Sequence, residues 1–155
     1  MNDLVGPVVI GVDEQTDLVI EVGRWTALAE AALRSEGVVA GELNLLFVGL
    51  AEMRDLNLAH MGKDRPTDVL SFPLDGADAS GAGAFIGDVV ICPAEAARNA
   101  PDHVDVDHHT GSVDDELALL VVHGVLHVVG HDHVKPDDAA PMEALEQMLL
   151  EAHYR

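Results

Sequence analysis

The stretch HGVLHVVGHDH, residues 123–133, decides how the rest of the chain can be interpreted. Its first two histidines are the only polar side chains in residues 117–129, and an apolar surface all round is typical of a buried central helix. Residues four apart share one face of a helix. Gly130 can end that helix, because glycine adopts the left-handed cap conformation. We therefore expect the third histidine to return and face the other two.

Three neutral imidazoles with an open fourth position are the ligand set of a catalytic zinc site. The spacing predicts one Zn²⁺ per chain, or another divalent metal, bound by His123, His127 and His133. The pattern matches the HExxHxxGxxH motif of zinc peptidases, except that Gly124 stands where their general base, a glutamate, would be. This difference argues against peptide hydrolysis by that route and leaves another metal-dependent hydrolysis as an alternative. Asp132 either orients a ligand imidazole or is a turn residue.

The composition is that of one globular domain spanning residues 1–155, with 48% apolar residues and only 3% aromatic ones. A single cysteine, Cys92, excludes an internal disulfide and suits a reducing compartment. The N-terminus lacks the basic stretch followed by an apolar run that is typical of a signal peptide. No apolar run reaches the length of about 18 residues that a membrane span needs. The expectation is a soluble, cytoplasmic protein.

The charge is strongly negative: the formal net charge is -20, with lysine only at positions 63 and 135. Such a chain lacks the broad basic surface that grips phosphates without specificity. If the substrate is a polyanion, local positive charge, a metal or a partner must hold it. The alternative explanation of the charge is solubility by self-repulsion.

The remaining pattern predicts an α+β fold. Short runs rich in branched residues predict strands at 7–13, 42–48, 67–72 and 85–91. Helical spacing predicts helices at about 21–36, 50–60, 94–99, 113–129 and 137–153. The last two strands can pair antiparallel, whereas the earlier strands, separated by helices, can be parallel. We expect a single small mixed sheet of about four strands with packed helices, and a central buried helix that carries the metal-binding histidines.

Two segments beside the central helix are also assigned. Residues 101–112 are expected to form an acidic surface loop, and Ser112 to cap the helix that follows it. The three histidines of this loop are interpreted as surface residues rather than ligands: His103, His108 and His109. The last helix is expected to turn an inner stripe toward the core, formed by Met142, Leu145, Met148 and Leu149.

Residues 123–133 resemble the signature of the YbeY family of bacterial metal-dependent endoribonucleases. Further stretches agree with that family: LN at 56–57, GKDRPTDVLSFP at 62–73, GDVVI at 87–91 and the closing helix at 142–149. The resemblance runs from about residue 42 to the end of the chain, and these motifs together are specific.

The resemblance implies a zinc-dependent, single-strand-specific endoribonuclease that matures the 3′ end of small-subunit ribosomal RNA and acts in ribosome quality control. It implies His123, His127 and His133 as the metal ligands. The expected partners are single-stranded ribosomal RNA and the ribosome or ribosomal proteins, with no DNA and no membrane.

The chain departs from the family around the metal. Many members have Tyr-Arg where this chain has His60-Met61, and a methionine cannot stabilise a developing phosphorane charge. Arg65 or Lys63 can substitute as a phosphate-binding catalytic residue, or either is a solvated turn charge. Ser71 is the polar candidate for the cleft wall.

His131 stands where the family has a tyrosine, and it acts either as an acid or base or as a passive surface residue.

The missing arginine and the negative charge also favour a different class of function. In that alternative the chain is a metal-binding ribosome-assembly factor with little intrinsic nuclease activity.

Overall fold

One mixed sheet is built from β1 (Val8–Asp13), β2 (Glu42–Phe47), β3 (Val69–Pro73) and β4 (Phe85–Ile91). The computed structural model describes residues 6–76, 83–131 and 136–155. The strand order is β1-β2-β4-β3. β2 pairs in parallel with both β1 and β4, whereas β3 and β4 are antiparallel. The α+β class, the four strands and their expected directions are confirmed.

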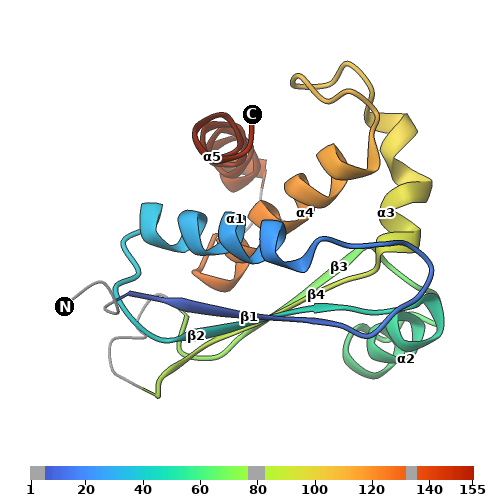
Figure 1. Ribbon diagram of the computed structural model, residues 1–155, viewed down its shortest axis with the longest axis horizontal. Helices are drawn as coiled ribbons and strands as arrows, with labels where there is room; N and C mark the ends of the chain where they lie inside the picture. The colour runs from blue at the N-terminus through green and yellow to red at the C-terminus, as the bar shows by residue number, and fades with distance from the viewer. Residues whose placement is uncertain (1–5, 77–82, 132–135) are drawn as a thin grey trace.

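The helices cover mainly one face of this sheet. Figure 1 shows α1 (Val22–Ser35) and α4 (Val113–Val128) above the sheet, with α5 (Pro136–His153) on their outer side. α2 (Leu50–Met61) lies at one end of the sheet on the opposite side, and α3 (Pro93–Asn99) follows β4. α4 is therefore the central helix, as expected: it packs on β3, β4, α1, α3 and α5.

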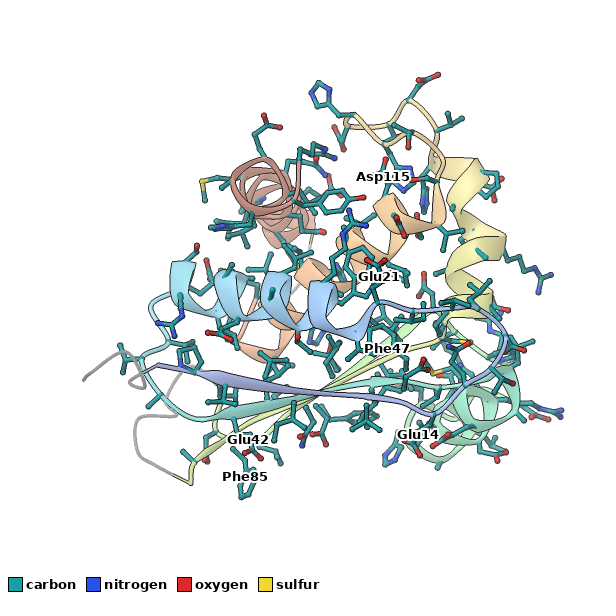
Figure 2. The ribbon with its side chains drawn as sticks, viewed as in Figure 1. Glu14, Glu21, Glu42, Phe47, Phe85 and Asp115 are labelled. Carbon is teal, nitrogen blue, oxygen red and sulfur yellow. The ribbon has the colours of Figure 1, made fainter. Side chains whose placement is uncertain are left out.

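The hydrophobic core has two parts because alternate strand residues face opposite sides of the sheet. The larger part lies between the sheet and the helices, where Figure 2 shows Phe47 pointing upward. The smaller part lies between the sheet and α2 and contains Val48, Met53, Leu70, Val90 and Cys92. Glu42 and Phe85 point away from the helices in Figure 2, and Phe85 is 51% exposed. Only the upper face of the sheet thus supports the central helix.

Several details differ from expectation. β3 begins at Val69 rather than at residue 67, and it includes Pro73, which an edge strand tolerates because it needs fewer ladder hydrogen bonds. The segment expected to be a plain loop from residue 101 begins with a 3₁₀ turn, η3 (Ala100–His103). Met148 is wrongly placed in the inner stripe of α5: it is 57% exposed, and Leu150 is buried instead. None of the described helices is long and apolar enough to cross a membrane.

Candidate functional site

Helix α4 presents His123 and His127 side by side. Their ring centroids lie 6.4 Å apart, which is the separation expected for residues one turn apart on one face. Both are half-buried, whereas most of the apolar residues around the helix are fully buried. The Ser112 side chain accepts a hydrogen bond from the Asp115 backbone N–H at 3.1 Å and caps the helix as expected. The two imidazoles are therefore held on a helix whose position is fixed by the packing of its apolar residues.

The end of α4 reverses the chain at a glycine. The helix ends at Val128, and Gly130 has a φ of +110°, which disfavours any residue with a side chain. His131 then turns toward α1, where its Nε2 lies 2.6 Å from Glu36 Oε1. His131 is thus half-buried and paired with a carboxylate. His133 and Asp132 lie outside the described residues, so the third ligand and its neighbour stay predictions.

A buried carboxylate from α5 faces the first histidine. Glu146 is 6% exposed, and both of its carboxylate oxygens lie 3.4 Å from His123 Nδ1. Metal-bound histidines usually donate the second ring N–H to a carboxylate, which fixes the tautomer and leaves the other nitrogen for the metal. Nδ1 of His123 faces Glu146, so a metal here would be held through Nε2. Half-buried imidazoles on one face with such a partner fit the expected metal.

Gly124 brings the central helix against the sheet. A Cβ built at this position would lie 2.5 Å from Val89 Cγ1 and 3.4 Å from Ser71 Oγ. The Ser71 hydroxyl donates a hydrogen bond to the Gly124 carbonyl at 3.2 Å. The residue after His123 therefore points into the packed contact between α4 and the sheet, and a glutamate has no room there. Ser71 thus lies against the helix that carries the histidines, but it is not among the residues that line the cleft containing His123, and its role in a cleft wall stays a prediction.

The other candidate catalytic residues lie on the turn after α2. Lys63 and Arg65 are exposed, and the carbonyl of Arg65 accepts a hydrogen bond from the buried Asn57 side chain at 2.8 Å. Met61 is 58% exposed, and the ring of His60 packs against Phe72 with centroids 4.9 Å apart. Among the described residues, the turn does not contribute to the cleft that contains His123.

That cleft lies between α4, α5 and the segment that precedes α4. Its volume is about 340 Å³. His123 and Glu146 line one part, and Asp68 and Arg155 also contribute. Within the described residues, Arg155 is the one Lys or Arg side chain on its wall. Arg155 donates hydrogen bonds to Gln147 Oε1 at 3.1 Å and to the Asp107 carbonyl at 2.8 Å. Sequence spacing offered no signal for this arginine, because its place depends on how α5 packs.

A second cluster of ionisable groups lines the same cleft. Glu116 Oε1 lies 2.7 Å from His103 Nδ1 and 2.9 Å from His109 Nε2. The interpretation of His109 as a surface residue is wrong, since it is 6% exposed. His108 is exposed, as expected. The loop bends back onto α4 through positive φ angles of +66° at Asp105, +48° at Asp107 and +68° at His108. The spacing of residues in the sequence does not predict such angles. These residues can hold a metal ion.

Asp115 joins the loop, α4 and α5 (Figure 2). Its carboxylate accepts hydrogen bonds from Thr110 Oγ1 at 2.6 Å and from Tyr154 Oη at 2.7 Å. Burial opposes ionisation of Asp115, but these hydrogen bonds and one from the Thr110 backbone outweigh it and lower its pKa to about 2. Burial, followed by the hydrogen bond to Asp115, raises the pKa of Tyr154. The carboxylate thus holds one wall of the cleft in place.

Acid is therefore expected to weaken the fold through Asp115. The pKa of this carboxyl is lowered in the folded state from 3.8 to about 2, so its contribution is present above pH 3.8 and is lost as the pH falls toward 2. The fall in pKa corresponds to about 2 kcal/mol of unfolding free energy. Urea unfolding at pH 6, 4, 3 and 2 measures it. The Asp115→Asn variant should lose this part of the pH dependence, whereas Asp114→Asn should keep it. Equal pH dependence in both variants would contradict the assignment.

Comparison with known proteins agrees with the geometry. Residues 11–154 match the family model described as "Endoribonuclease YbeY". A curated relative of that name from Salinispora tropica is 41% identical over 150 residues, covering 90% of this chain and 88% of the relative. A second, from Mycolicibacterium gilvum, is 37% identical, covering 92% of this chain and 81% of the relative.

The fold is also similar to the solution structure of TM1509 from Thermotoga maritima. That match has a TM-score of 0.62 at 24% sequence identity, and it covers 96% of this chain and 89% of the other. At this identity the likeness concerns the fold alone.

Proposed function

The chain belongs to the YbeY family of endoribonucleases, and we propose that it is a zinc-dependent enzyme that cleaves single-stranded ribosomal RNA. The proposal rests on one observation above all: two half-buried imidazoles lie on one face of α4, and the first of them, His123, lines a cleft and faces a buried carboxylate. His123, His127 and His133 are the proposed ligands. Two-histidine spacing on a rigid helix with a third nitrogen donor nearby is the arrangement that zinc favours.

Zinc in such a site would lower the pKa of a bound water and polarise a phosphoryl oxygen. The chain's own residues supply the rest. The helix keeps the two imidazoles one turn apart, and Glu146 fixes the orientation of His123. Ser71 is hydrogen-bonded to the Gly124 carbonyl, so its proposed role is to position the helix beside the metal.

Removing the carboxylate behind His123 is expected to weaken zinc binding. The Glu146→Gln variant keeps the side-chain shape but not the charge, and partners of this kind typically change metal affinity 10- to 100-fold. Competition with a chromogenic chelator measures the affinity without any assay of activity. Glu151→Gln is the matched control, because Glu151 is an exposed residue of the same helix and does not line the cleft. Equal zinc affinities in Glu146→Gln and the wild type would remove Glu146 from the site.

Phosphate binding by a chain of net charge -20 needs local positive charge. Arg65 and Lys63 remain proposed phosphate-binding residues on the turn after α2, and Arg155 is an additional one because it lines the cleft with His123. An arginine can clamp a phosphate with two parallel hydrogen bonds.

Replacing each of these three cationic side chains is expected to change the kinetics of RNA cleavage in a different way. Arg155→Ala is expected to raise KM for RNA about 10-fold, which is the effect of losing about 1.4 kcal/mol of charge-assisted binding. If Arg65 or Lys63 fills the role of the family arginine, its alanine variant lowers kcat instead. Arg54→Ala is the control, because Arg54 is paired with Asp64 on the exposed side of α2. Steady-state cleavage of a fluorescent RNA separates KM from kcat. Wild-type values in all three variants would exclude these side chains from substrate binding.

The proposal extends to the RNA that the enzyme cleaves and to the compartment in which it acts. We propose the 3′ end of small-subunit ribosomal RNA in the cytoplasm as the substrate, with the ribosome or its proteins supplying the contacts that an acidic surface cannot make with free RNA. DNA and membranes are not proposed as partners. The net charge and the exposed Met61 favour one alternative, a metal-binding assembly factor with little intrinsic nuclease activity.

The substrate assignment is tested with the zinc-loaded chain and three matched oligonucleotides. A single-stranded RNA carrying the 3′-end sequence should be cut, whereas the same RNA in a duplex and the same sequence as DNA should survive. Small ribosomal subunits carrying unprocessed RNA form a fourth substrate. If the chain binds those subunits but cuts neither free nor ribosomal RNA, the assembly-factor alternative holds.

A further inference from the structure

Glu116 has a buried carboxylate with one oxygen left over. The residue is 1% exposed, and both histidine contacts are made to Oε1. Oε2 is buried as well and has no hydrogen-bond partner among the described residues. Buried charged groups are normally paired and hydrogen-bonded, because desolvation of a bare carboxylate is expensive. The hydrogen bonds of the cluster therefore leave one buried carboxylate oxygen unpaired, and a bound cation would pair with it.

We propose that His103, His109 and Glu116 form a second divalent metal site, separate from the three-histidine site. Two imidazoles and one carboxylate are a known zinc ligand set. Their ligand atoms all lie within 4.8 Å of one another. Tetrahedral zinc with bonds of about 2.1 Å needs ligand atoms about 3.4 Å apart, so small side-chain shifts suffice.

The protonation of the imidazoles shows what changes when the metal binds. The Gly111 backbone N–H donates to His109 Nδ1 at 2.9 Å, so the Nδ1 atom is bare and the proton is on Nε2. A metal on Nε2 displaces that proton, and the neutral ring then carries its proton on Nδ1. Nδ1–H can no longer accept from Gly111. Metal binding thus breaks the Gly111 contact, and the Gly111 amide becomes a reporter of this site.

The position of the cluster separates its role from that of the other site. Glu116 lies seven residues before His123 on α4, which is two turns or about 10 Å along one face. Metal pairs that act together on one phosphate lie about 4 Å apart. The second ion would instead bind the loop to α4 and offset the acidic cleft residues Asp68 and Asp107. It would place positive charge in the cleft of a chain with net charge -20.

Metal content of the full chain tests this site independently of the three-histidine site. The His123→Ala/His127→Ala variant is stripped with a chelator, dialysed against Zn²⁺ and measured by elemental analysis. We expect one equivalent of zinc to remain, and none after the further change Glu116→Gln. The matched control is a further His108→Gln change in the exposed neighbour, which should leave one equivalent. Co²⁺ in place of zinc should give a visible absorption band that follows the same pattern.

Folding is checked by circular dichroism. If Glu116→Gln prevents folding, the half-exposed His103→Gln variant takes its place. In NMR spectra the Gly111 amide signal should shift on adding Zn²⁺ to the His123→Ala/His127→Ala variant.

Zinc that persists after Glu116→Gln, an unchanged Gly111 signal, or the absence of zinc from the His123→Ala/His127→Ala variant would each overturn the second site. A wild-type chain that holds no more zinc than the His123→Ala/His127→Ala variant would instead overturn the three-histidine site.

Discussion

Replacing His127 by alanine is expected to reduce cleavage of single-stranded RNA by more than about 100-fold. Loss of a carboxylate behind a metal ligand already costs 10- to 100-fold in affinity or activity, and loss of the ligand itself should exceed that. Alanine keeps the helix, since it is the best helix former. The effect is therefore expected in the chemistry and not in folding.

The measurement compares initial rates on a fluorescent single-stranded RNA with saturating zinc. His108→Ala is the matched control, because His108 is an exposed histidine of the loop before α4. A contaminating nuclease would survive in both variants, whereas the chain's own activity should survive only in His108→Ala. Wild-type rates in His127→Ala would remove the helix from the proposed mechanism. An inactive wild type with zinc bound would favour the assembly-factor alternative.

The second large effect concerns stability. Gly124→Ala is expected to lower the unfolding free energy by about 1–3 kcal/mol, the usual cost of forcing an extra carbon into a packed contact. The new Cβ would lie 2.5 Å from Val89 Cγ1, and valine cannot rotate away freely on a strand. Urea unfolding monitored by circular dichroism measures the change.

A matched glycine in another helix provides the control. At Gly23 of α1 no heavy atom lies within 4 Å of a built Cβ, so Gly23→Ala should be neutral or stabilise by up to about 1 kcal/mol. If both variants have the same stability, the close approach of α4 to β4 is not the reason that position 124 is a glycine. Gly124→Glu is expected to prevent folding rather than to create a peptidase, because a buried unpaired charge adds to the overlap.

The pattern of the chain predicted most of the fold. Strand and helix positions follow from the spacing of apolar residues, and these spacings reflect local geometry that each segment has by itself. The parallel and antiparallel pairings were also predictable, because the length of each connection limits them. What failed were boundaries and exceptions. Met148 is exposed because the helical turn places it away from the face of α5 that buries Met142, Leu149 and Leu150.

The functional residues divide in the same way. Sequence alone determined that His123 and His127 lie together on a central helix, since both belong to one regular element in which spacing defines the face. The matching motifs likewise predicted the endoribonuclease family, which the comparisons confirm. These features depend on neighbours in the chain.

Tertiary structure alone decided which side chains surround that helix. Glu146 reaches His123 from α5, and His109 reaches Glu116 through a loop bent by positive φ angles. Close packing of α4 on β4 explains why position 124 is glycine. Each of these contacts depends on a packing angle or a loop conformation, to which residues distant in sequence contribute, and no local spacing records it.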